Sequence, residues 1–455
     1  MTVSPAPTSQ VGPPWASRYR WLLFAVIGTG YLLVYFHRLA PAVVALDMMR
    51  DLSAGGGLMG LLASAYFYPY ALMQIPSGLL SDSWGPRKTI TVFFVIAGLG
   101  SVLLGLAPNT GLAVLGRTLV GLGVAMLFVP SLKLLTCWFS VGEFAKMTGL
   151  FMAVGGLGAL SATAPMAWLS VLLGWRGSFL CIGVATLLMA AVIWIVVRDR
   201  PEDKGLPPVD GLLRRGHDPK APAPSLRRGL GMVMTERRFW PIFAWFFFTF
   251  GIFFSFGGLW GGPYLMHAHG LSKAQAGGVL SMLAVGLLLG GPLYSILSDR
   301  LLRSRKKPIV ASAAIMLLLT LPLAFAPGVM PLAVLYHWCL LFGFAGNAVV
   351  VVGFSACKEL FPTSIAGTAV GLMNLSPFLA GAIMQPLIGL VLEAHGTAAT
   401  GYPPAAYGKA FLMYVGCGVL ALASSLLISE TFGGLALRGQ RGPVGETTGP
   451  TAKRA

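Results

Sequence analysis

Apolar runs of about 20 residues recur along almost the whole chain, and this feature constrains the fold more than any other. Of the 455 residues, 56% are hydrophobic and only 10% are charged. A run of this length crosses the hydrocarbon core of a bilayer as a helix. The runs are too long for barrel strands and do not alternate between polar and apolar residues. The sequence therefore predicts an all-α, polytopic membrane protein whose partner is the lipid bilayer.

The runs form two groups of six, separated by a polar segment rich in Pro, Gly and Arg that is typical of a linker. We expect a short amphipathic helix near residues 226–235 of this linker. The expected regions are a tail (1–20), a six-helix bundle (21–197), the linker (198–238), a second bundle (239–430) and a tail (431–455). The expected spans lie near 21–46, 58–80, 89–107, 112–138, 145–172, 178–197, 239–266, 274–297, 308–326, 331–357, 365–392 and 409–429.

The formal charge of +17 comes from 32 Lys and Arg against 15 Asp and Glu. Such an excess can indicate nucleic-acid binding, but most basic residues lie in the tails, the linker and turns on the same side of the proposed topology. By the positive-inside rule, this places both termini and the linker in the cytoplasm. The charge therefore reflects topology, and we expect no nucleic-acid partner. Four prolines and no early apolar core at the start of the chain argue against a cleaved signal peptide.

The two groups of spans also resemble each other. Ser81-Asp82 ends the second expected span and Ser298-Asp299 ends the eighth, and basic residues follow in both cases. This repeat indicates a duplicated six-helix unit with parallel halves. In that architecture, substrate sites lie at the interface between the repeats.

A turn between the second and third spans carries a family resemblance. Its residues are Gly78, Asp82, Gly85, Arg87 and Lys88. This spacing resembles the loop signature of the major facilitator superfamily, and the arrangement of six plus six spans resembles that family over nearly the whole chain. The resemblance implies a monomeric secondary active transporter in which this loop, with Asp299 as its counterpart, is a gate latch between the halves. Arg117-x-x-x-Gly121-x-Gly123 similarly resembles the family's arginine motif in the fourth span. The simpler alternatives are a positive-inside turn and an interfacial arginine.

Charged residues inside the membrane are costly unless they face a cavity or a partner. The resemblance implies that spans one, four, seven and ten line a central cavity. Span one contributes Arg38, with Tyr31 and Tyr35 on a related face. Span four contributes Lys133, for which the alternative is snorkelling at the cytoplasmic end of the span. No carboxylate lies near the middle of these spans, so the cavity should favour an anion. "YFHRLAPA" also resembles the organophosphate and organic-anion branches, whose first-span arginine binds the anionic group of the substrate. A guanidinium suits this role because its fork matches carboxylate and phosphate.

Two histidines are candidates for proton coupling. His37 precedes Arg38 where sugar-acid symporters of this branch tend to carry a carboxylate, and His337 lies in the tenth span. An imidazole near its own pKa could take a coupling proton. Anion exchange would need no proton carrier, and a packed histidine without a transport role is an equal alternative for both. The sequence does not choose among these.

Further candidates for substrate contact are aromatic or amide residues. "FGGLWGGPYL" in the seventh span supplies Trp260 and Tyr264 on a glycine-rich helix, with interface anchoring as the alternative. Asn347 in the tenth span and Asn374 in the eleventh could hydrogen-bond a ligand or a neighbouring helix.

These features predict a transporter of a small organic anion, a carboxylate or a phosphate ester, across the bacterial inner membrane, driven by protons or by anion exchange. One alternative is a transporter of amino acids or short peptides, and another is a transporter-like ligand sensor. We expect no enzyme activity, because no intramembrane nucleophile, base and acid occur together. We expect no cofactor or metal: no nucleotide-binding loop is present, and the five cysteines lie in or at the ends of spans.

Overall fold

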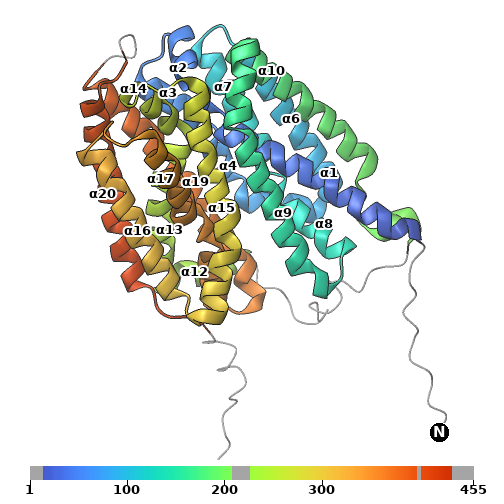
Figure 1. Ribbon diagram of the computed structural model, residues 1–455. Coiled ribbons are helices and arrows are strands. Elements are labelled where there is room, and N and C mark those ends of the chain that lie inside the picture. Colours follow the sequence, from blue (N-terminus) through green and yellow to red (C-terminus); the bar gives the residue numbers. More distant parts are fainter. Residues whose placement is uncertain (1–13, 207–225, 397–400, 433–455) are drawn as a thin grey trace, which may run out of the picture.

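The computed structural model describes residues 14–206, 226–396 and 401–432. The expected tails (1–20 and 431–455) lie largely outside these ranges, and the expected linker (198–238) is described except for residues 207–225. Helices account for nearly all of the described residues, as the apolar runs predict. The N-terminal half and the C-terminal half of the chain form two helical groups that lie side by side (Figure 1).

The helices of the N-terminal half are short wherever proline or glycine interrupts a span. Pro69, Pro130 and Pro165 each lie in the first turn of a new helix, where the missing N–H of proline costs no hydrogen bond. The elements are α1 (Pro14–Leu39), α2 (Pro41–Asp51), α3 (Gly56–Ser64), α4 (Phe67–Leu72), α5 (Gln74–Ser83), α6 (Pro86–Leu106), α7 (Thr110–Val124), α8 (Phe128–Trp138), α9 (Val141–Ser161) and α10 (Ala164–Val196).

The C-terminal half keeps longer helices but contains π-helical turns. Between the halves lie η1 (Pro201–Lys204) and α12 (Leu226–Thr235), and α12 confirms the helix expected in the linker. The further elements are α13 (Phe239–Ser255), η2 (Phe256–Trp260), α14 (Gly261–Ala268), α15 (Lys273–Ile296), η3 (Leu297–Leu301), α16 (Lys306–Phe325), α17 (Leu332–Gly343), η4 (Phe344–Ala348), α18 (Val350–Glu359), α19 (Thr363–Glu393) and α20 (Pro404–Leu427). Of these, η2, η3 and η4 are the π-helical turns.

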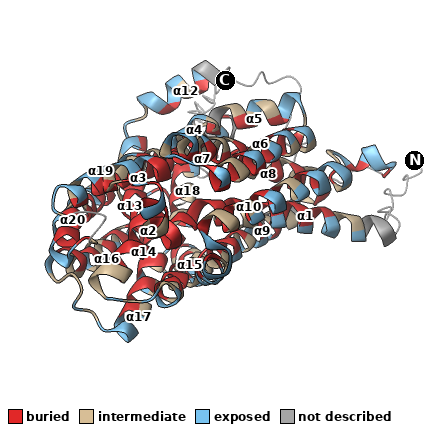
Figure 2. Cartoon of the chain, turned by 90° about the horizontal axis from the view of Figure 1, so that it is seen from above, coloured by how far each residue is buried: buried red, intermediate tan, exposed pale blue. Residues whose placement is uncertain are grey.

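Ten helical stretches of the described chain are long and apolar enough to cross a membrane. The two other expected spans, 58–80 and 145–172, correspond to α3–α5 and to α9 with the first part of α10. Gly174, at φ +68°, kinks α10 where the fifth span ends and the sixth begins. The outward faces of the helices are exposed (Figure 2) and carry large apolar side chains such as Leu188, Ile195 and Leu427. Exposed apolar surface on every side is what a lipid environment requires.

The two halves meet along a seam whose packing differs between its ends. Across this seam α3 packs on α19, and α9 and α10 pack on α15. We call the end with α12 and the start of α1 the linker end, and the end with α2, α3 and α14 the far end (Figure 1). The linker end is the one that the charge pattern predicts to be cytoplasmic.

Glycines along the seam show that the halves touch at the far end and separate at the linker end. A Cβ on Gly60 of α3 would lie 2.6 Å from the Gln385 carbonyl oxygen and 2.6 Å from Pro386 Cα of α19. On Gly277 of α15 it would lie 2.9 Å from Cβ of Ala167. Nearer the linker end, the seam helices carry glycines whose Cβ would meet no atom within 4 Å. These glycines are Gly78, Gly149, Gly291 and Gly371.

Candidate functional site

The site forms where the first span breaks. Pro41 starts α2 and has no N–H, so the carbonyl of His37, four residues earlier, lacks its usual helical donor. Arg117 of α7 supplies the missing bond from Nη1 to the His37 oxygen, at 2.8 Å. A cation at the C-terminal end of a helix is also favoured by the helix dipole. The break therefore places Arg38 in the last turn of α1, braced by a second arginine.

The Arg38 guanidinium lies in a cage of aromatic rings, and its side chain is almost completely buried. Its central carbon is 4.7 Å from the ring centre of Tyr35 and 5.0 Å from that of Tyr70. It is also 5.1 Å from the ring centre of Phe378 and 5.7 Å from that of Phe254. Cations are attracted to the faces of such rings, most strongly where water is excluded. The cage thus stabilises the charge without neutralising it.

Both halves of the protein build this cage. Tyr35 and Tyr70 belong to the N-terminal half, whereas Phe254 of α13 and Phe378 of α19 belong to the C-terminal half. The rings of Tyr70 and Phe378 meet across the seam with centroids 4.0 Å apart. Arg38 donates from Nε to the Tyr66 hydroxyl at 3.3 Å. No carboxylate of the described chain forms an ion pair with it.

One turn from the touching rings, towards the linker end, an amide pair also bridges the halves. Asn374 Nδ2 donates to Gln74 Oε1 at 2.7 Å. Gln74 starts α5 and donates from Nε2 to the Tyr70 carbonyl oxygen at 3.2 Å, and Asn374 precedes Phe378 by four residues on α19. Asn374 was expected to bind a ligand or a neighbouring helix, and here it contacts a helix. Gln74, a polar residue inside the second span, could from the sequence equally contact a ligand or a neighbouring helix, and it too contacts a helix.

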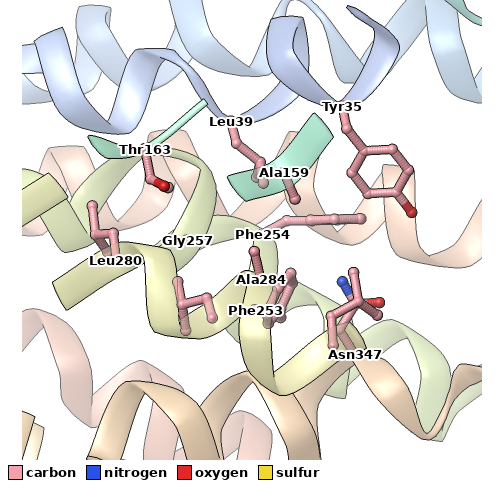
Figure 3. Close-up of a pocket in the computed structure, with 12 residues that line it drawn as sticks. Tyr35, Leu39, Ala159, Thr163, Phe253, Phe254, Gly257, Leu280, Ala284 and Asn347 are labelled. Carbon is pink, nitrogen blue, oxygen red and sulfur yellow. The ribbon is translucent and has the colours of Figure 1, made fainter. Parts of the chain in front are cut away.

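Tyr35 also lines a small pocket at the seam (Figure 3). Asn347 of η4 lies on the opposite wall of this pocket and is buried, as expected for a residue that faces the cavity. The remaining walls are mostly apolar and come from both halves, including Leu39, Phe253 and Leu280. The ring of Tyr31 packs edge-on against the ring of Tyr35, and it stacks on Phe128 and Phe151 within the N-terminal half. Tyr35, Asn347 and Thr163 are therefore the polar residues that line the seam pocket.

At the far end, polar contacts hold the halves together. Lys273, at the start of α15, forms an ion pair with Asp47 of α2. The Gly57 backbone N–H donates to Glu393 Oε2 of α19 at 3.0 Å. Together with the close glycine packing, these contacts close the far end of the seam.

We expect the ion pair between Asp47 and Lys273 to contribute about 0.5–1 kcal/mol to this closure, because both side chains are mostly buried but remain partly wet. A double-mutant cycle with Asp47→Asn and Lys273→Gln, read out as melting free energy, should show a coupling of that size. Asp47→Asn also removes the contact of Asp47 with Arg50. This loss is the same with Lys273 and with Gln at position 273, so it cancels in the coupling energy. Strictly additive single effects would contradict a direct interaction.

A comparison with known families decides what kind of protein this is. Residues 21–385, most of the chain, match the family model of the Major Facilitator Superfamily. The chain belongs to the Major Facilitator Superfamily. It is therefore a multi-pass membrane transporter rather than an enzyme, as the sequence predicts.

Several bacterial transporters resemble this chain over most of their length. A protein of Cupriavidus necator named "Probable sulfoacetate transporter" is 24% identical, covering 83% of this chain and 88% of its own. A "Probable galactarate/D-glucarate transporter" of Bacillus subtilis is 25% identical over 90% of this chain and 91% of its own. Among solved structures, a bacterial homologue of the human lysosomal transporter Spinster superposes with a TM-score of 0.71. It is 18% identical, with 90% of this chain and 96% of the other covered, which shows the shared fold.

The superfamily loop signature forms the turn between α5 and α6. Gly85 has φ +86°, the conformation that glycine adopts most easily. The guanidinium of Arg87 donates to the Trp194 carbonyl oxygen within the N-terminal half, and Lys88 is exposed. Asp82 pairs with Lys133 of α8 at 2.7 Å, and Asp299 pairs with Arg305.

The loop pairs bear on the expected roles of Asp82, Asp299 and Lys133. Each pair stays within its own half, so in this conformation neither Asp82 nor Asp299 latches the halves together. Lys133 binds Asp82 and the Ser81 carbonyl oxygen near the linker end, away from Arg38. Its cation therefore belongs to the loop region in this structure and not to the aromatic cage.

Both histidine candidates point away from the cage. The His37 ring is buried inside the N-terminal half, where Nε2 lies 3.0 Å from the Thr186 hydroxyl of α10. His337 is exposed on the face of α17 that also carries the exposed Val334 and Leu341, and it bonds the Ala333 carbonyl oxygen. The expectation that His337 faces the central cavity is therefore wrong, because that face of α17 is the outward one.

Trp260 and Tyr264 are also packed away from the seam pocket. Trp260 donates from Nε1 to the Gln385 carbonyl oxygen at 2.9 Å, and Tyr264 bonds His269. Both are fully buried, in elements (η2 and α14) that also pack against α2 of the N-terminal half. Their expected role in substrate contact is not supported by this arrangement, which makes them packing residues of α14 and its neighbours.

Proposed function

We propose that this superfamily transporter carries a small organic anion, a carboxylate or a phosphate ester, by alternating access at the seam. The observation that carries the proposal is Arg38, a buried guanidinium at the junction of the two halves with no carboxylate paired to it in the described chain. An anion that entered the cage would replace ring faces with charge-assisted hydrogen bonds, which are stronger. The names of the relatives, transporters of sulfoacetate and of galactarate or D-glucarate, support this substrate class.

The same arrangement supports a route for the substrate. The far end is closed by glycine packing and by the contact of Asp47 with Lys273, whereas the seam is open at the linker end. In a bacterial inner membrane with cytoplasmic termini, the site would be reached from the cytoplasm in this conformation. An anion approaching Arg38 from there would have to separate the pairs Gln74–Asn374 and Tyr70–Phe378. Separation of these pairs would be a step of the transport cycle.

For energy coupling, we retain both proton coupling and anion exchange. His37 would have to leave Thr186 to reach an anion on Arg38, so the geometry favours exchange or a proton acceptor elsewhere. An amino acid or peptide substrate is less well supported, because its amine would need an acidic partner. No ion-paired carboxylate of the described residues lies at the cage.

A melting-temperature screen of the purified protein in detergent tests this function. The probes are D-glucarate, sulfoacetate and glucose 6-phosphate, each compared with a neutral compound of similar size, and with glycine and dialanine. A ligand at 100 times its Kd should stabilise the native state by about 2.7 kcal/mol. We expect stabilisation by at least one anion and by none of the neutral compounds. Stabilisation by neutral or zwitterionic probes alone would overturn the anion proposal.

A further inference from the structure

A second buried arginine lies directly behind the cage. Arg117 is 1% exposed, and its only described hydrogen bond is the one from Nη1 to the His37 carbonyl oxygen; Nε has no partner among the described residues. Its guanidinium carbon lies 5.0 Å from the ring centre of Tyr66. Tyr66 is the residue whose hydroxyl accepts from Arg38. One buried tyrosine thus separates two buried cations.

The contact between α4 and α7 fixes this arrangement. A Cβ on Gly121 would lie 2.1 Å from the Tyr66 carbonyl oxygen, so only glycine permits this approach of the two backbones. The Arg38 guanidinium carbon is 6.0 Å from the same ring centre as that of Arg117. Because the two guanidinium carbons lie 6.0 Å and 5.0 Å from the same Tyr66 ring centre, they can be at most about 11 Å apart.

Neither arginine has an acidic partner within the part of the chain that the structure describes. The described ion pairs involve other residues, most of them near the ends of spans. Two buried like charges without a counter-ion repel each other, and burial of an unpaired charge is costly. A ligand with two negative charges would relieve this situation more than a ligand with one.

We propose that the anion site prefers dianions over monoanions of the same size, and that Arg117 provides part of this preference. Arg38 would contact the ligand. Arg117 is a positioning residue: it holds Arg38 through the His37 carbonyl group and through Tyr66, and it adds positive potential from behind. This inference rests on the proposed anion site at Arg38 and narrows its substrate class to compounds such as dicarboxylates, sulfocarboxylates and phosphate esters.

The expected size of the effect follows from Coulomb's law. For a ligand charge placed about 11 Å from the Arg117 guanidinium, with an effective dielectric constant of about 20, the attraction corresponds to roughly a tenfold change in affinity. The loss of the Arg117 charge should therefore weaken the binding of a monoanion about tenfold and the binding of a dianion about a hundredfold. A mere displacement of Arg38 would weaken both by the same factor. The ratio of the two affinities thus separates an electrostatic role from a structural one.

The experiment measures Kd by isothermal titration for two matched pairs of probes on the full-length protein. D-glucarate and D-gluconate differ by one terminal carboxylate, and sulfoacetate and isethionate differ in the same way. The wild type should bind the dianion of at least one pair at least tenfold more tightly. In Arg117→Gln this ratio should fall about tenfold, and in Arg117→Lys, which keeps the charge, it should persist.

The outcomes separate this inference from the proposed function. A wild-type ratio near one for the pairs that bind overturns the dianion preference, even if Arg117→Gln fails to fold. An unchanged ratio in a folded Arg117→Gln also overturns the role of Arg117 but leaves the anion site at Arg38 standing. If no probe binds, or if binding survives Arg38→Gln unchanged, the anion site itself fails and this inference with it.

Discussion

Replacement of Arg38 by Gln should reduce anion affinity and transport by at least about a hundredfold. The glutamine keeps a polar side chain but loses the charge and the planar fork. Hydrogen bonds to charged groups contribute about 1.5–3 kcal/mol each, so the loss of a bidentate contact accounts for this factor. Arg38→Lys should bind the anion less tightly than the wild type but more tightly than Arg38→Gln, because lysine keeps the charge without the planar fork. The measurements are Kd for the anion found in the screen and its counterflow in proteoliposomes.

Arg176→Gln is the matched control for Arg38→Gln. Arg176 also carries a guanidinium, but it binds Asp51 near the far end, outside the cage. We expect the Kd of Arg176→Gln for the anion to match that of the wild type within about threefold, because the Arg176 charge is partly exposed and already paired. If Arg38→Gln bound the anion as tightly as Arg176→Gln, the aromatic cage would not be the substrate site.

The second large effect is expected at the far end of the seam. Gly60→Ala would place a methyl group 2.6 Å from the backbone of Gln385 and Pro386, and neither backbone group can rotate away. Overpacking of this kind costs about 1–3 kcal/mol. The closed far end should therefore open or the melting temperature should fall. A bias of about 3 kcal/mol would shift the balance between the two conformations by about a hundredfold. Transport should decrease in proportion.

Gly416→Ala controls for the change in helix propensity. Gly416 lies within α20 with no atom within 4 Å of its Cβ position, so the same substitution meets open space there. Alanine favours a helix over glycine by about 1 kcal/mol, and the variant should be as stable as the wild type or more so. Melting temperature and proteoliposome transport should distinguish the two variants. Equal behaviour would show that close packing at Gly60 is not required for the cycle.

The sequence was sufficient to predict the spans and the linker helix. Apolar length indicates the spans directly, and α12 lies where the linker helix was expected. The break at Pro41 was not predicted, because the first span was expected to run without interruption over residues 21–46. The absence of a carboxylate near Arg38 was also visible, because it follows from residue types alone. Features that depend only on composition and order were therefore predictable.

The direction in which each side chain points was much harder to predict. In a membrane, lipid and protein interior are both apolar, so hydrophobic periodicity does not tell which face of a helix is inward. His37 and Arg38 are adjacent, yet one faces α10 and the other the seam. In the seventh span, the π-turn η2 adds a further rotation between Phe254, which faces the cage, and Tyr264, which does not. Such turns leave no clear mark in the residue pattern.

Arg38 in the cage and Arg117 behind it also have an electrical consequence for the transport cycle. An elementary charge that crosses a membrane potential of 100 mV gains or loses about 2.3 kcal/mol. The empty site exposes two unneutralised cations to this field, whereas a site loaded with a dianion is close to neutral. In a proton-coupled cycle, which includes the return of the empty carrier, the membrane voltage should therefore act mainly on that step. A cell that changes its resting potential would thereby change the rate of transport without any change in substrate concentration.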